Sequence, residues 1–255
     1  MDLGYFLFII SGLKYNSLIA VTSFITGLAL AIAIILVDEA VIKARGRITR
    51  FYSYVFTGIP PLVIISIMYW LVLPSLGVRG SPVIAAIMAF SLRTSAFQAM
   101  ILKSTINSLD ESQVQGGLSL GLNIREVYTY LVIPQAVVLS IPSLTNELAS
   151  LLKESTQALA IGVLDTLARA RYVTIATGYS LLWLGITGII MYLLSNSLIL
   201  TARNLQRKGL FPGTSRDLLT SPGTSEKNYG EGAKQNRLKG GLLMFMAPRI
   251  KRQSL

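Results

Sequence analysis

Long apolar runs constrain this 255-residue chain more than any other feature. Hydrophobic residues make up 52% of the sequence and charged residues only 14%, whereas ordinary soluble domains carry about 25% charged residues. A helix needs about 20 mostly apolar residues to cross a bilayer, and several runs reach that length. The sequence therefore predicts an all-α, polytopic membrane protein.

Five transmembrane helices are expected, at about residues 16–37, 51–73, 82–102, 127–152 and 179–200. In the second, Gly58 and the pair Pro60–Pro61 should break the helix early, because proline removes a donor and clashes with the preceding turn. The segment Met1–Leu13 lacks the basic start and cleavage site of a signal peptide, and we interpret it as an interfacial lead-in. The apolar stretch Ala158–Leu164 is too short to span and is expected in a re-entrant or outer-surface helix.

Basic residues indicate the orientation of the chain. The short loop after the first expected span holds four of them, which marks it as cytoplasmic: Lys43, Arg45, Arg47 and Arg50. The amino terminus is then outside and the carboxyl terminus cytoplasmic. Residues from Arg203 onward hold 11 Lys and Arg against 3 Asp and Glu, so the net charge of +11 is mostly a C-terminal excess. A tail held near anionic lipid accounts for this excess; a nucleic-acid-binding arm is the alternative.

The chain divides into two parts by composition. Residues 1–208 are expected to form the transmembrane domain, and residues 209–255 a basic, disordered cytoplasmic tail that is too polar to bury a core. Within the tail, Leu242–Arg252 has apolar residues followed by basic ones. This piece is either a membrane-surface segment or an extension without function.

Missing residue types exclude several classes of chemistry. The chain has no Cys and no His, which removes thiol chemistry, the usual zinc sites and histidine acid–base catalysis. It also has no Gly-Lys dipeptide and therefore no P-loop, so any ATP must be bound by another chain. A membrane-embedded enzyme is disfavoured on these grounds. A channel or secondary transporter is a further alternative, although convincing internal repeats, which such transporters often carry, are lacking.

A polar, glycine-punctuated segment lies between two apolar runs, from Ser112 to Pro134. Gly116 and Gly117 would allow a partner to approach closely, and Gly121 would permit a positive-φ turn before Asn123 begins the next helix. The segment is therefore either a docking loop or an ordinary polar connection with incidental glycines.

This segment resembles the cytoplasmic coupling loop of ABC-importer permeases, in which an acidic-small-small triplet precedes a fixed glycine and an apolar pair ending in proline. Here the corresponding residues are Gln115, Gly116, Gly117, Gly121 and Pro134. Further stretches are similar to the permeases of polar amino-acid importers, and they cover about residues 12–205: Phe56–Leu62, Ser91–Ala99, Gln135–Ala136, Pro142, Asn146, Ser150–Thr156 and Ile161–Val163.

The resemblance implies a MetI-like permease fold of five spans with a coupling helix in the loop 112–126. It implies alternating access without catalysis by this chain, with ATP and Mg bound by the partner ATPase and no cofactor bound here. The implied partners are ABC ATPase subunits, a second permease subunit and an extracytoplasmic solute-binding protein. A permease for another small solute is the alternative.

The chain departs from the family pattern at several positions. Thr57 stands where the family usually has Arg, Arg93 where it has Asn, Met100 where it has Glu, and Gln115 where it has the acid of the loop. An arginine near the centre of a span costs about 2.5–3.5 kcal/mol on insertion scales. We therefore expect Arg93 to face the protein interior or water.

Polar residues in the fourth expected span recur at helical spacing. Ser143, Asn146, Ser150, Lys153 and Gln157 would form one stripe on a continuous helix, flanked by Glu147 and Glu154. A stripe with both signs of charge suits a path for a zwitterionic solute. The alternative is that the charged residues pair with each other or with Arg93 and hold helices together. The predicted path comprises Arg93, Asn146, Glu147, Lys153 and Glu154.

Overall fold

The computed structural model describes residues 3–40, 46–78 and 80–207, with side chains described as far as Asn204. The basic residues Lys43 and Arg45 and the expected tail 209–255, including Leu242–Arg252, lie outside the described residues. Within the described ranges the chain is helical and contains no strand, which confirms the all-α prediction.

The described helices follow one another with short connections. They are α1 (Leu3–Ile10), α2 (Leu13–Ala40), α3 (Arg47–Gly58), α4 (Pro61–Ile67), the π-helical turn η1 (Met68–Val72), α5 (Leu73–Ser75), α6 (Pro82–Ser108), α7 (Glu111–Ser119), α8 (Ile124–Val127), the π-helical turn η2 (Tyr128–Val132), α9 (Ile133–Glu154), the 3-10 helix η3 (Ser155–Ile161), α10 (Thr166–Thr177) and α11 (Ser180–Arg207).

Four helical stretches in the described residues are long and apolar enough to cross a membrane: Leu3–Ala40, Pro82–Ser108, Ile124–Ile161 and Ser180–Asn204. A fifth is a bent pair, Arg47–Gly58 with Pro61–Ser75, whose two parts meet at 94°. The break falls where the prolines predict it: Ile59 and Pro60 have extended backbone, and Pro61 is the first residue of α4. The helical stretch at the amino end is longer than the expected first span, because α1 precedes α2 with only a turn between them.

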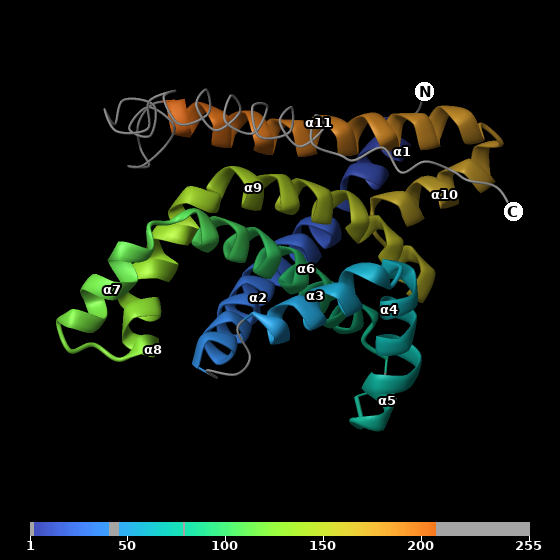
Figure 1. Cartoon of the computed structure of the whole chain (residues 1–255). Coiled ribbons are helices and arrows are strands. Elements are labelled where there is room, and N and C mark those ends of the chain that lie inside the picture. The colour runs from blue at the N-terminus through green and yellow to red at the C-terminus, as the bar shows by residue number, and fades with distance from the viewer. Residues whose placement is uncertain (1–2, 41–45, 79, 208–255) are drawn as a thin grey trace, which may run out of the picture. The chain divides into compact units, whose positions relative to one another are not determined.

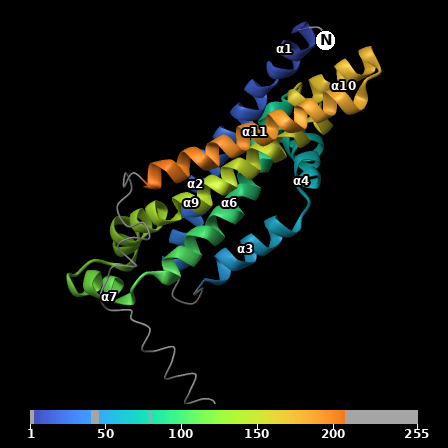
Figure 2. The ribbon, with the colours of Figure 1, turned by 90° about the horizontal axis from the view of Figure 1, so that it is seen from above.

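The spanning helices pack side by side through small residues. Helices α2 and α6 contact each other along much of their length, as do α6 with α9 and α9 with α11 (Figure 2). Gly27 of α2 lies against α6, where an added Cβ would stand 2.5 Å from Thr94 Cγ2. Ser23 of α2 donates to the Ile87 carbonyl at 3.1 Å. Such close approach of backbones is the usual basis of helix packing in membranes.

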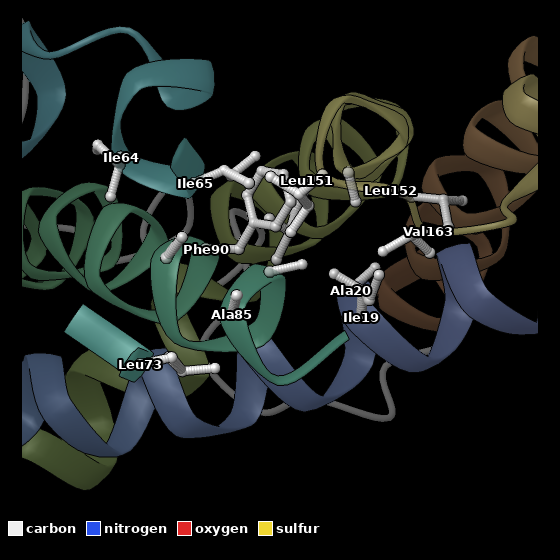
Figure 3. Close-up of a cluster of buried hydrophobic side chains, with 14 residues drawn as sticks. Ile19, Ala20, Ile64, Ile65, Leu73, Ala85, Phe90, Leu151, Leu152 and Val163 are labelled. Atoms are coloured by element: carbon white, nitrogen blue, oxygen red, sulfur yellow. The ribbon is translucent and has the colours of Figure 1, made fainter. Parts of the chain in front are cut away.

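The main apolar core joins α2, α4, α6, α9 and η3. Figure 3 shows the side chains of Ile65, Phe90 and Leu151, from three of these helices, pointing toward one another. All three are at most 1% exposed. A second core, which includes Ile35, Leu102 and Val127, lies beneath the α7–α8 region. Through this second core, the region packs on α2 and α6.

The two ends of the helical domain are formed by different helices. The α7–α8 region lies at one end, and α1 and α10 lie at the other (Figures 1 and 2). Near the α7–α8 end, buried Asp38 of α2 accepts hydrogen bonds from Thr49 N at 3.1 Å and Thr49 Oγ1 at 2.6 Å, which ties α2 to the start of α3. Glu39 pairs with Lys103 of α6.

Candidate coupling loop and polar path

Helix α7 begins at a carboxylate cap. The Asp110 side chain accepts a hydrogen bond from Ser112 N at 2.9 Å, which satisfies one of the free N–H groups at a helix start. This bond holds the pKa of Asp110 below its ordinary value. The carboxylate is therefore ionised at neutral pH and complements the positive end of the α7 dipole.

Gly121 reverses the chain after α7, as the sequence predicts. Its φ is +87°, the left-handed region that favours glycine. Leu122 N donates back to the Gly117 carbonyl at 3.3 Å, which closes the end of α7. Asn123 then caps α8 in a capping box: Glu126 N donates to Asn123 Oδ1 at 3.1 Å, and Asn123 N donates to Glu126 Oε2 at 2.8 Å.

The two adjacent glycines of α7 have different surroundings. Gly117 is buried against the following helical segment, where an added Cβ would lie 2.8 Å from Val127 Cγ2 and 3.1 Å from Leu131 Cδ1. Gly116 is exposed and has no atom within 4 Å of an added Cβ. Gln115 beside it is also exposed. Gly117 therefore serves packing within the chain, and Gly116 leaves its backbone open on the surface.

Pro134 lies just after a widened turn. Ile133 N donates to the Tyr128 carbonyl five residues earlier, so η2 is π-helical. A proline ring clashes with the carbonyl four residues before it in a regular α-helix, and a π-helical turn relieves such a clash by widening the backbone. The same arrangement recurs at Pro74, which follows η1.

The charged residues of α9 divide between two surroundings. Glu154 pairs with Arg93 of α6, and Thr94 Oγ1 donates to Glu147 Oε1 at 3.0 Å. Both carboxylates thus contact α6, and Arg93 also lies over the Phe97 ring with its Cζ 4.7 Å from the centroid. The Arg93 side chain is 13% exposed. It faces the protein interior, as its cost in a span predicts.

The other predicted path residues on α9 are open to the surroundings. Asn146 and Lys153 are exposed, as is Ser143, whereas Ser150 and Gln157 are half-buried. The structure therefore brings Arg93, Glu147 and Glu154 together between α6 and α9. It leaves Asn146 and Lys153 on the free face of α9.

A second polar cluster was not predicted from the sequence. Asn16, Ser155, Asp165 and Thr166 are fully buried and hydrogen-bonded to one another. We call this cluster the Asn16 junction. Its one sequence signal is the pair Asp165–Thr166, a typical helix start in which Asp165 Oδ1 accepts from Ala168 N at 2.8 Å. Nothing local links this start to Asn16, which is 150 residues from Thr166.

Solved structures share this fold. The chain of one, titled an amino acid ABC transporter with histidines, superimposes with a TM-score of 0.69 at 25% sequence identity, covering 82% of this chain and 99% of that one. A chain of the inward-facing MetNI methionine ABC transporter gives a TM-score of 0.67 over the same shares at 14% identity, a likeness of fold. The protein therefore has the MetI-like fold of ABC-transporter permeases, as predicted.

The sequence specifies the family. Residues 40–211 match the family of binding-protein-dependent transport system inner membrane components, and the chain belongs to this family. Among its relatives, the arginine transport system permease protein ArtQ of Bacillus subtilis is 33% identical over 79% of this chain and 92% of its own length. A putative glutamine transport system permease protein GlnP of Rickettsia felis is 31% identical over 67% of this chain and 78% of its own length.

Family membership confirms several predictions. The chain is a multi-pass permease component of an inner-membrane ABC importer and is not an enzyme. Binding-protein-dependent transport implies partner subunits, namely an ATPase and a solute-binding protein.

Proposed function

We propose that this chain is a permease subunit that moves polar amino acids through the membrane by alternating access, driven by a separate ATPase. The observation that carries the proposal is the set of opposite charges between α6 and α9, where Arg93, Glu147 and Glu154 meet inside a membrane domain. Relatives named for arginine and glutamine transport, and the structure with histidines, support this class of solute.

The proposed path runs along α9. Asn146 and Lys153 on its free face, with Arg93, Glu147 and Glu154 beside α6, offer an amide, two cations and two carboxylates to a solute that carries a carboxylate and an ammonium. Arg93 Nε is buried without a hydrogen-bond partner among the described residues. A solute carboxylate would satisfy this donor once the path opens around it. Because Arg93 already neutralises Glu154, a zwitterionic solute suits the path better than a cationic one.

The proposed motor contact is the exposed face of α7. An ATPase docks on Gln115 and Gly116, where the bare glycine backbone permits close approach. Gly117 and the apolar contacts below it then pass motion to α8, η2 and α9. ATP and Mg are held by the ATPase, and no cofactor by this chain. In this arrangement the α7–α8 end is cytoplasmic, the amino terminus is outside, and a second permease subunit completes the pore.

Reconstitution tests the function directly. The permease, its ATPase and its binding protein are placed in vesicles, and uptake of labelled arginine, glutamine and histidine is measured with and without ATP. The proposal requires ATP-dependent uptake of one of these solutes. Uptake without ATP would indicate a secondary transporter or channel, and ATP-dependent uptake of an unrelated solute would indicate the alternative permease.

The path and the docking face are tested by variants. The double change Lys153→Met with Glu154→Gln is expected to lower uptake while the complex still assembles, and unchanged uptake would remove these residues from the path. Gly116→Phe is expected to abolish co-purification of the ATPase. Gly185→Phe is the matched control, because Gly185 of α11 also has open space around it.

A further inference from the structure

The Asn16 junction joins three segments of the chain at the end of α9 that is remote from the coupling loop. Asn16 belongs to the first turn of α2, Ser155 begins η3 directly after α9, and Asp165 and Thr166 begin α10. All four residues are 0% exposed. A polar cluster buried this completely is stable only when its groups are hydrogen-bonded.

The side-chain amide of Asn16 satisfies this requirement. Its Nδ2 donates to Ser155 Oγ at 2.9 Å and to Asp165 Oδ2 at 3.1 Å. Its Oδ1 accepts from Thr166 N at 3.0 Å and from Thr166 Oγ1 at 2.7 Å. Both amide hydrogens and the carbonyl are thus used, so separation of α2 from α10 would leave several buried groups without partners.

Backbone contact reinforces these bonds one turn earlier. Gly12 lies so close to the start of α10 that an added Cβ would stand 2.5 Å from Thr166 N and 2.6 Å from the Asp165 carbonyl carbon. Arg169 of α10 reaches back over this contact, donating to Ser11 Oγ at 2.8 Å and lying over the Phe8 ring. Main chain therefore packs on main chain, with little freedom for sliding.

The helical stretch that contains α9 extends from the Asn16 junction to the exposed coupling loop. Ile124–Ile161 is one 38-residue helical stretch that includes α8, η2, α9 and η3. Between its two ends, α9 contacts α6 through side chains: Glu147 accepts from Thr94, Ser140 is hydrogen-bonded to Thr105, and Leu151 packs on Phe90. Side-chain contacts can follow a small tilt by changing rotamer or sliding, whereas the backbone contact at Gly12 cannot.

We propose that the Asn16 junction is the pivot of α9: it stays closed throughout the transport cycle while the loop end of the helix swings. Asn16 is then a positioning residue that converts a push on the coupling loop into a tilt of α9. This inference rests on the proposed docking of an ATPase at α7, and it does not depend on which solute is carried.

Distance measurements on the assembled complex test the pivot. Since the sequence has no Cys, spin labels can be attached at introduced cysteines alone, with labelled permease diluted so that each complex carries one pair. One pair is Leu7→Cys with Ile175→Cys, exposed sites on α1 and α10; the other is Val37→Cys with Leu118→Cys, exposed sites on α2 and α7. The distances are measured without nucleotide, after addition of ATP, and with nucleotide trapped on the ATPase. The first distance should change by about 2 Å or less, the scale of small helix shifts, and the second by clearly more. An equal or larger change in the first pair would overturn the pivot.

A reciprocal exchange tests the role of Asn16. Asn16→Asp and Asp165→Asn each remove the donor–acceptor match between the two side chains, and each should lower solute uptake per ATP hydrolysed several-fold in assembled complexes. The combination of both changes restores a matched pair and should recover the ratio. Unchanged ratios in both single variants would show that the junction only supports folding. Failure of the parent complex to take up amino acids would refute the proposed function, while the distances still test the pivot.

Discussion

The two ends of the helical stretch Ile124–Ile161 make different kinds of contact with the rest of the chain. At the loop end, Gly116 leaves open surface, and the nearest atoms to an added Cβ at Gly117 belong to the side chains of Val127 and Leu131. At the Asn16 junction, Gly12 contacts backbone, and the amide of Asn16 is saturated with hydrogen bonds. Side-chain contacts can adjust and main-chain contacts cannot, so the comparison shows where a membrane helix can yield and where it is fixed.

The largest effect on stability is expected from a substitution at the Asn16 junction. Gly12→Val places a branched side chain where even a Cβ would overlap Thr166 N, and backbone cannot move aside cheaply. We expect a loss of about 3 kcal/mol or more, seen as a lower Tm and a smaller folded yield in detergent. Gly4→Ala is the control, because Gly4 of α1 has open space around it. A Gly12→Val protein as stable as its parent would show that the junction is not rigid.

Alanine substitutions at the two adjacent glycines of α7 should change stability in opposite directions. Gly117→Ala forces Val127 and Leu131 aside, at a cost of about 1–3 kcal/mol. Gly116→Ala adds a methyl group in open space within a helix and should stabilise by about 0.5–1 kcal/mol. Thermal unfolding of the two variants measures the difference. Equal responses would contradict the distinct surroundings of the two glycines.

The ion pair between α6 and the last residue of α9 should make a smaller contribution to stability. Arg93→Met leaves Glu154 without its partner, and Glu154→Gln does the converse. Because both side chains remain partly exposed, we expect a coupling energy of about 1 kcal/mol in a double-mutant cycle on unfolding. Thr94→Val, which removes the bond to Glu147, provides the comparison. A coupling energy of zero would mean that the pair does not join α6 to α9.

The smallest effect concerns pH at the loop end. The pKa of Asp110 is lowered by its bond from Ser112 N. Its contribution to the start of α7 is therefore complete above the ordinary aspartate pKa and is lost as the pH falls through the lowered folded value. Hydrogen exchange at Ser112 N should speed up, relative to a reference amide, only in that acidic range. Asp110→Asn should abolish this dependence, and persistence of the dependence would assign it to another group.

Local signals in the sequence predict the loop well. The positive φ at Gly121, the helix start at Asn123 and the break at Pro60–Pro61 each depend on residues within about one turn, so spacing alone indicates them. The apolar runs likewise predict the spans, because length and hydropathy decide whether a segment can cross a bilayer.

Packing decides what local signals cannot. The sequence suggests one stripe on α9, but the rotation of α6 brings Arg93 to Glu154 and Thr94 to Glu147 and leaves Lys153 outside. Asn16 reads as a lone amide at the edge of an apolar run, because its partner Thr166 is 150 residues away. Such pairings depend on helix rotation and register, which no short window of sequence contains.

The π-helical turn at Tyr128–Val132 has a consequence for the length of the chain. A π-helical turn holds one more residue than an α-helical turn. Removing one residue there would leave a regular α-helix, and the side chains on both sides would keep their directions about the helix axis. The same deletion in the middle of α9 would rotate all later side chains about the axis by about 100°. Pro134 depends on the wider turn. The chain can therefore be shortened at this place only if Pro134 is replaced in the same step.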